Sequence, residues 1–362
     1  VKEANGYDYF FCVRLTNVTD RRSFVVVDAT RPGCNSKKGN WSGSRVPIFI
    51  AEHFGTWYVL DGTRSCAGHD CHRMQLWIEA KQTIYLCNSL PNPPSGVQKW
   101  INDIRQRHKN STSLSCIGTS SQGRDIMLLT ITDSDVENND KDRVLITSGF
   151  HPAEPDWLAT TEIVKRLLGL DDWARELQRN FIFDVIVQVN PDGAELGHNG
   201  CTSNGVNMYW DFRRLKPDAS PEALSLWAWI EAHPPALYLD FHCYVHQLHK
   251  DFRPYIRPRS DYSKLARPIV KAIDKRLIAA CNGRYVQGPS TNLPSTLAAQ
   301  ITQMYGTVTY TKLHLHLAHG VYDCRRLGLE MFRIIVDGAR AHRPLQPKIW
   351  PGTVEAKTLE DN

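Results

Sequence analysis

From residue 97 onward the chain alternates between strand-like and helical patterns, and this alternation limits the possible folds more than any other feature. Apolar strand-like runs lie at 144–147, 181–187, 236–241 and 308–317, and amphipathic helical patterns lie at 97–107, 156–169, 221–232, 261–280 and 325–339. Such alternation is typical of a largely parallel sheet with helices on both faces. We therefore predict an α/β domain over residues 93–345, followed by a C-terminal tail over residues 346–362.

The chain up to about Asn88 has a different sequence pattern, without the alternation of helices and strands. Short alternating or β-branched runs, such as Ser23–Asp28 and Met74–Ile78, are separated by Gly, Pro and Asn. Short strands with turn signals at this spacing predict a small antiparallel β-sandwich over residues 1–92. The Pro-rich segment Leu90–Gly96 marks the boundary, and 362 residues are enough for two domains.

Composition and charge argue against two classes of partner, nucleic acids and membranes. The net charge of +5 is modest and scattered, and we interpret the densest basic cluster, at 253–259, as a solvated loop rather than the rim of a site for anions. We expect no nucleic-acid partner. No apolar stretch approaches the roughly 20 residues that a membrane span needs, so we expect no membrane partner either.

The ten cysteines are scattered and include no CxxC pair. This usage is typical of a reduced protein, so we expect a cytoplasmic location. A second zinc site is not predicted, because its candidate ligands have no matching partner pair; these candidates are Cys66, His69, Cys71 and His72.

Three candidate metal ligands follow two of the strand-like runs. His151 and Glu154 come just after the run 144–147, and His242 ends the run 236–241. In open α/β sheets, ligands bind outside the carboxyl ends of the strands. Two imidazoles and one carboxylate suit a catalytic zinc, which takes three protein ligands and leaves a fourth position for water. We predict that His151, Glu154 and His242 bind one Zn²⁺, although other divalent ions suit the same ligands.

Four segments, in order, resemble the zinc metallocarboxypeptidase family, and more narrowly its cytosolic carboxypeptidase-like branch. Ile117–Ile126 resembles an early strand of the family domain, His151–Glu154 its HxxE zinc motif, Asn190–Gly193 its NPDG turn, and Leu239–His242 the strand with the third zinc ligand. The resemblance implies an α/β/α sandwich around a mixed eight-stranded sheet. It also implies a zinc-dependent hydrolase.

Two departures from the family pattern concern the substrate pocket. Gly200 stands where the family has an arginine that orients the substrate, and Tyr209 and Trp210 stand at the Asn-Arg pair that holds the terminal carboxylate. Aromatic rings cannot supply the bidentate grip of a guanidinium on a carboxylate. Arg213 or Arg214, from a shifted register, is the alternative source of that grip. We expect Tyr209 and Trp210 to pack against a sugar or aromatic group of the substrate, with packing in the core as the alternative.

The third departure concerns the general base, because the strand-like segment 305–317 carries no acid. Counting from its Tyr-Gly step places His314 where the family has a glutamate. Strand side chains alternate, so His314 and His316 share one face. An imidazole with a pKa of about 6.5 suits proton transfer at neutral pH, so both are candidate catalytic residues, with His314 preferred. The alternative is a pair of surface histidines.

Asp240 and Asp192 are candidates for orienting the ligand imidazoles, or else are structural turn carboxylates. The whole pattern predicts a zinc-dependent amide hydrolase with an atypical specificity, such as a deacylase, an N-deacetylase or an amidase. Its substrate would be a small-molecule, sugar or peptide amide. The alternatives are a catalytically inactive, zinc-binding pseudo-peptidase that acts as a scaffold, and a carboxypeptidase with a relocated carboxylate clamp.

Overall fold

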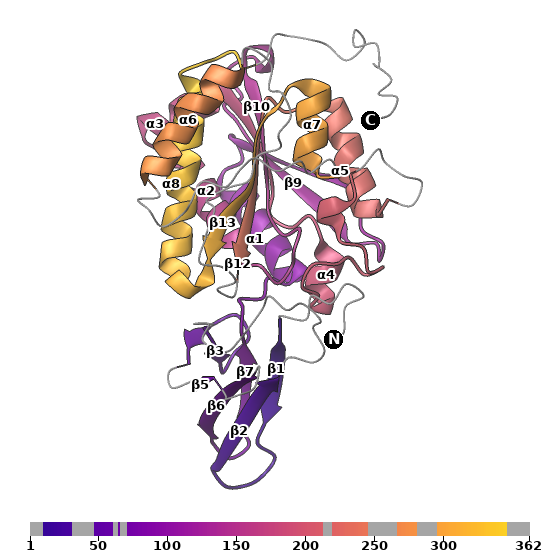
Figure 1. The fold of residues 1–362 in the computed structure, drawn as a ribbon, viewed down its shortest axis with the longest axis vertical. Helices are drawn as coiled ribbons and strands as arrows, with labels where there is room; N and C mark the ends of the chain where they lie inside the picture. The colour runs from indigo at the N-terminus through magenta and orange to yellow at the C-terminus, as the bar shows by residue number, and fades with distance from the viewer. Residues whose placement is uncertain are drawn as a thin grey trace.

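The computed structural model describes residues 10–30, 47–60, 64–65, 71–212, 219–244, 266–280 and 295–345. A smaller region of β-strands extends from one end of a larger α/β region (Figure 1). Several predicted features lie outside the described residues: Arg213, Arg214, Cys66, His69, the basic cluster at 253–259 and the tail at 346–362. The division of the chain at residues 92 and 93 stays a prediction.

The smaller region contains two antiparallel sheets. One has the order β1 (Cys12–Thr16), β7 (Thr83–Cys87), β3 (Phe49–Ala51) and β4 (Tyr58–Val59), and the other has the order β2 (Ser23–Thr30), β6 (Cys71–Ile78) and β5 (Arg64–Ser65). Alternate side chains of β6 and β7 enter one shared apolar cluster, among them Met74, Leu76, Ile84 and Leu86. The antiparallel pairing predicted for this region is confirmed. The prediction was possible because apolar residues alternate here with the period of a strand.

One sheet organises the larger region, in the order β13-β12-β10-β11-β9-β8. Its strands are β8 (Thr112–Thr119), β9 (Asp125–Ile131), β10 (Asp142–Thr147), β11 (Phe181–Ile186), β12 (Leu237–Tyr244) and β13 (Val308–His316). Strands β11, β10, β12 and β13 run parallel to one another, whereas β9 is antiparallel to both β11 and β8. The sheet is mixed, as expected, and the described residues contribute six strands to it where eight were predicted.

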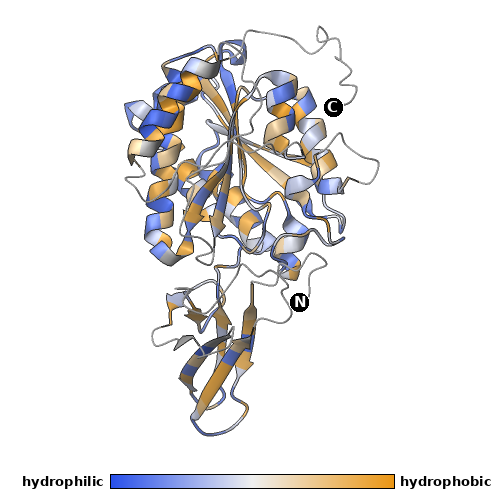
Figure 2. Cartoon of the chain, viewed as in Figure 1, coloured by the Kyte–Doolittle hydropathy of each residue, from blue (hydrophilic) through white to orange (hydrophobic). Residues whose placement is uncertain are grey.

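Helices cover both faces of this sheet (Figure 1). One apolar cluster holds residues of α1 (Pro94–Arg107), α2 (Trp157–Leu167), α3 (Asp172–Asn180), α6 (Ala266–Ala280) and α8 (Val321–Arg340), and the other holds residues of α5 (Pro221–Ala232) and α7 (Leu297–Tyr305). Parallel strands that are covered on both faces are apolar along their length, and Figure 2 shows the central strands as largely hydrophobic. No helix among the described residues has the length and apolar character needed to cross a bilayer.

The segment Ile117–Ile126 differs from its predicted form as one strand. It contains the end of β8, a turn, and the start of β9. The turn is closed by a hydrogen bond from Ser120 N to Arg124 O and passes through Gly123, whose φ is +77°. Glycine adopts positive φ without a steric penalty, so the chain can reverse here.

Helices α3, α4 (Pro191–Leu196) and α7 were not predicted. The six residues of α4 are too few to show a helical period. Its beginning is nevertheless encoded locally: Asn190 caps it by accepting a hydrogen bond from Gly193 N, and Pro191 occupies the first turn.

Candidate metal centre

His151 and Glu154 lie on a tight turn after β10. Gly149 starts this turn with a φ of +75°, and a Cβ at this position would lie 3.0 Å from Gln188 Cα, so glycine fits best. Glu154 N then donates to His151 O over 2.9 Å, and α2 begins shortly after Pro155. The turn brings the two side chains together, with Nδ1 of His151 3.0 Å from Oε1 of Glu154.

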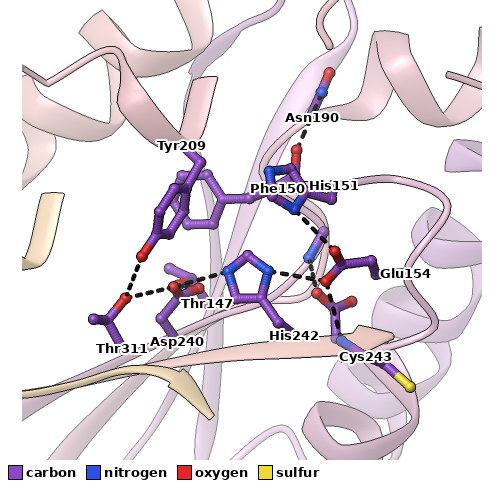
Figure 3. A network of polar contacts seen from close by, with 12 residues as sticks. Thr147, Phe150, His151, Glu154, Asn190, Tyr209, Asp240, His242, Cys243 and Thr311 are labelled. Atoms are coloured by element: carbon purple, nitrogen blue, oxygen red, sulfur yellow. Dashed lines mark hydrogen bonds and ion pairs between the residues drawn. The ribbon is translucent and has the colours of Figure 1, made fainter. Parts of the chain in front are cut away.

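His242 reaches the same point from the neighbouring strand. β12 pairs with β10 in parallel, with Thr147 opposite Asp240, so His242 lies just beyond the end of β10. Its Nδ1 lies 2.9 Å from Oε2 of Glu154. Ligand atoms of His151, Glu154 and His242 all lie within 4.8 Å of one another (Figure 3). The structure therefore brings the three predicted ligands to one point.

The outer nitrogen of each imidazole faces an oxygen. Nε2 of His242 lies 3.1 Å from Oδ2 of Asp240, and Nε2 of His151 lies 3.3 Å from Oδ1 of Asn207. These acceptors favour a proton on each Nε2, so each Nδ1 is left to face the centre. Hydrogen bonds of this kind orient metal-binding histidines in proteins. The donor set fits zinc, which binds imidazole nitrogens and carboxylate oxygens.

Burial and charge act against each other at this centre. Burial would lower the pKa of His242, but the Asp240 and Glu154 carboxylates outweigh it and raise the pKa to about 10. Burial likewise opposes ionisation of Glu154, yet His242 and His151 hold its pKa well below the usual range. The carboxylate is thus kept ionised and shared between two imidazoles. A divalent cation that bound here would displace a proton.

Asp240 connects His242 to a chain of hydroxyl groups behind it (Figure 3). Thr311 Oγ1 donates to Asp240 Oδ2 over 2.9 Å, and Thr147 Oγ1 donates to Oδ1 over 3.2 Å. The Tyr209 hydroxyl lies 3.1 Å from Thr311 Oγ1. Asp240 therefore has the geometry expected of a residue that orients a ligand imidazole.

Tyr209 does not project into solvent as a substrate-stacking residue would. It is 3% exposed, and its ring packs edge-to-face against His242 at 5.1 Å and lies 5.7 Å from the ring of His151. This geometry matches the alternative of core packing. Trp210 is 37% exposed beside Tyr209, with ring centres 4.9 Å apart, so it keeps an accessible ring near the centre.

Gly200 lies against the first ligand. A Cβ at this position would lie 3.4 Å from Cδ2 of His151. The position where the family has an arginine therefore borders the metal centre directly, and glycine leaves it without a side chain.

Asp192 has partners other than the ligand imidazoles. Its buried carboxylate accepts hydrogen bonds from Ser120 Oγ at 2.6 Å, Gln122 N at 2.8 Å, Arg124 Nη1 at 2.7 Å and Ser203 Oγ at 3.0 Å. The bonds from Ser120, Gln122 and Arg124 join α4 to the turn between β8 and β9, and the bond from Ser203 joins it to the chain that follows α4. The structure thus places Asp192 in the alternative role of a structural turn carboxylate.

His314 and His316 are buried, with 4% and 3% exposure, so the alternative of two surface histidines is wrong. In the register of β12 and β13, His314 lies opposite His242 and His316 lies opposite Tyr244. The rings of His314 and His242 are 6.4 Å apart. His316 lies farther along the strand, where its ring contacts Tyr244 at 5.4 Å and His319 at 5.8 Å.

A bulge between β12 and β13 sets this alignment. Leu239 pairs with Tyr310, but Phe241 pairs with Leu313, so β13 has one extra residue in this interval. The extra residue shifts the alternation of β13 by one. Thr311 contacts Asp240 before the bulge, and His314 lies beside His242 after it. Without the bulge, Thr311 and His314 would lie on opposite faces of β13, because they are three residues apart.

Several supporting residues were missed in the sequence. Asn207 contacts the predicted ligand His151, and the main-chain N–H of Cys243 donates to Glu154 over 3.1 Å. Thr311 contacts Asp240, which in turn contacts His242. Asp156 is fully buried and accepts from Gly149 N over 3.0 Å, and its burial raises its pKa well above the usual range. Asn207 had one available signal, because it directly precedes the short segment with the two aromatic residues.

Comparisons with known proteins agree with this geometry. A model of the zinc carboxypeptidase family, Peptidase M14, matches residues 97–318. Cytosolic carboxypeptidase 6 of Caenorhabditis elegans is 26% identical over 136 residues, which cover 36% of this chain and 30% of that protein. Cytosolic carboxypeptidase 3 of Bos taurus is 22% identical over 262 residues, which cover 65% of this chain and 25% of that protein. The chain therefore matches less than a third of the length of either relative.

Solved structures share the fold over nearly the whole chain. A metallo-carboxypeptidase from Burkholderia cenocepacia has a TM-score of 0.74 at 18% identity, covering 92% of this chain and 89% of that one. A metallo-carboxypeptidase from Pseudomonas aeruginosa, solved with (2-guanidinoethylmercapto)succinic acid, has a TM-score of 0.72 at 17% identity, covering 91% and 90%. Since the family model spans more than half of the sequence, the chain belongs to the zinc carboxypeptidase family, Peptidase M14.

Proposed function

We propose that the protein is a zinc-dependent hydrolase of an amide bond, with His151, Glu154 and His242 as the ligands of one zinc ion. The observation that carries this proposal is the convergence of their ligand atoms within 4.8 Å. The oxygen acceptors at both outer imidazole nitrogens support it. When bound, the ion would polarise the carbonyl of the scissile bond and activate a water molecule for attack.

His314 is the proposed general base. An imidazole nitrogen of His314 would take a proton from the attacking water and return it to the leaving amine. Its ring lies 6.4 Å from that of His242, near enough to act on a group held at the centre. His316 is the weaker candidate, because it lies opposite Tyr244, two residues beyond His242 on β12.

The proposed substrate is an amide without a free carboxylate next to the scissile bond. Gly200 has no side chain, and Tyr209 directs its hydroxyl to Thr311. Neither position offers a guanidinium for a carboxylate. The exposed ring of Trp210 offers an apolar platform instead. An N-acyl sugar, an N-acyl amino acid with a blocked carboxyl group or a peptide amide would fit, so we propose a deacylase, N-deacetylase or amidase.

A matched substrate screen tests this specificity. The zinc-loaded protein would be assayed on N-acyl sugars and on pairs of peptides that differ only in a free or amidated C-terminus. We expect turnover that a chelator abolishes, with the amidated peptide cleaved at least as fast as the free one. A strong preference for the free carboxylate would instead indicate a carboxypeptidase with a relocated clamp, for which Arg213 and Arg214 are the candidates.

The second candidate is a zinc-binding pseudo-peptidase. The absence of an acidic residue from β13 is the observation that favours it. Stoichiometric zinc binding without turnover on any amide class would establish it over the hydrolase. For location, we propose the cytoplasm, in line with the names of the cytosolic carboxypeptidase relatives.

A further inference from the structure

We infer that Ser89, in the segment that joins the N-terminal strands to α1, positions the metal-binding turn. Ser89 Oγ donates a hydrogen bond to the main-chain oxygen of Ala153 over 2.6 Å. Both residues are buried, with 0% and 5% exposure. Ala153 lies between His151 and Glu154, so this bond supports the turn that carries two of the three proposed ligands. The inference rests on the proposed metal centre.

The Ala153 carbonyl lies just before the hydrogen-bonded part of α2. The main-chain bonds that start this helix run from Leu158 N to Pro155 O and from Ala159 N to Asp156 O. Neither of these two bonds uses the Ala153 carbonyl, which instead accepts from Ser89. A buried carbonyl that loses its donor is destabilised, so without the Ser89 hydroxyl the turn would relax to find another partner. Such a shift would move Glu154 relative to His242.

The segment around Ser89 is itself held at several points. Phe11 N donates to Asn88 Oδ1 over 2.8 Å, which joins it to the N-terminal strands. Gln188 Nε2 donates to Asn92 O over 2.7 Å, and Gln188 lies against Gly149, where the metal-binding turn starts. Hydrogen bonds of residues 88, 89 and 92 thus connect the N-terminal strands to the turn that carries His151 and Glu154. This connection would therefore help to determine the geometry of the metal centre.

Zinc affinity of the full chain tests this role. The dissociation constant of zinc would be measured by competition with a chelating dye, and the visible spectrum of the cobalt-loaded protein would report ligand geometry. Ser89→Ala should weaken zinc binding about tenfold, the lower end of the loss found when a residue that orients a metal ligand is replaced. Ser89→Thr keeps the hydroxyl and should stay close to the unmodified protein.

Asn17→Ala provides the matched control. The Asn17 amide donates to the carbonyls of Arg21, Ile78 and Glu79, so its loss loosens the N-terminal strands without touching Ala153. This variant should unfold at a lower temperature and bind zinc normally. If Ser89→Ala does not fold, Ser89→Cys, with a weaker donor, takes its place.

Three results would overturn the inference: unchanged zinc affinity in Ser89→Ala, an equal loss in Ser89→Thr, or an equal loss in Asn17→Ala. Failure of the unmodified protein to bind zinc would be a different result. It would refute the metal centre, and this inference with it.

Discussion

His242 and His314 lie opposite each other on neighbouring parallel strands, with ring centres 6.4 Å apart and ring planes at 75°. One is a proposed zinc ligand and the other the proposed base. The β12–β13 bulge produces this pairing, because an unbroken alternation from Thr311 would direct Leu313 towards the centre instead. One extra residue therefore determines which face of β13 lies towards the proposed metal centre.

Replacing the proposed base should separate chemistry from metal binding. We expect His314→Gln to lower kcat by about a hundredfold to ten-thousandfold, the usual contribution of general acid–base catalysis, without changing zinc affinity. Steady-state kinetics and zinc titration would measure the two effects. His316→Gln is the control and should lose much less activity. Full activity in His314→Gln would exclude this residue as the base.

The metal-free protein should lose stability as the pH rises. The pKa of His242 is raised from its ordinary value of 6.5 to about 10 in the folded state. A raised pKa in the folded state stabilises the fold fully below pH 6.5, and this stabilisation is lost as the pH rises through about 10. Urea unfolding in the presence of a chelator should show this decline. His242→Gln should show less of it, and an equal decline in that variant would assign it to another group.

Zinc binding should release a proton from His242 at neutral pH. Because its pKa is about 10 without metal, His242 is protonated at pH 7, and its Nδ1 must lose that proton to bind a cation. Calorimetric titration in buffers with different ionisation enthalpies would count the released protons. We expect about one proton per zinc and an affinity that rises with pH. Proton-independent binding would contradict His242 as a ligand.

The two candidate orienting carboxylates should behave differently when neutralised. Asp240→Asn removes the charge beside His242 Nε2 and should weaken zinc binding about tenfold to hundredfold. Asp192→Asn should leave zinc affinity intact. It should lower the free energy of unfolding by about 1–3 kcal/mol, because Ser120 and Arg124 lose a charged acceptor. Zinc titration and chemical unfolding of both variants would measure these effects. Equal zinc affinities of Asp240→Asn and Asp192→Asn would contradict the different roles assigned to the two carboxylates.

Substitutions of the two neighbouring aromatic residues, Tyr209 and Trp210, should have different effects on zinc affinity and on KM. Tyr209→Phe removes only the hydroxyl that contacts Thr311, so we expect a severalfold weaker affinity for zinc and little change in KM. Trp210→Ala removes an exposed ring and should raise KM without altering zinc binding. Kinetics and zinc titration on both variants decide the point. A large rise in KM in Tyr209→Phe would instead show that the Tyr209 hydroxyl contacts the substrate.

The sequence was sufficient to predict the meeting point of the three ligands. His151 and Glu154 follow the apolar strand β10, His242 lies near the end of the apolar strand β12, and the carboxyl ends of parallel strands meet at one edge of a sheet. The alternation of buried strands and amphipathic helices, which have distinct periods, predicts the parallel part of the sheet. The mixed character of the sheet followed only from the family resemblance, because the period of a strand does not reveal that β9 is antiparallel to its neighbours.

The orientation of single side chains was harder to predict. The type of residue at position 209 indicated an aromatic contact, but not that the ring would lie beneath the imidazoles. For Asp192, the partners Ser120 and Arg124 lie about seventy positions away, on a turn between β8 and β9, where the sequence predicts a single strand. Long-range hydrogen bonds leave no local period in a sequence, so only the folded chain reveals them.

Main-chain pairing sets the relative position of strands β10 and β12, from which the three candidate ligands extend. The positions of these strands therefore do not depend on the side chains found at neighbouring positions such as 200 and 210. On such a frame, evolution can change the surroundings of a metal-binding point by altering a few bordering side chains, while the two strands keep their spacing.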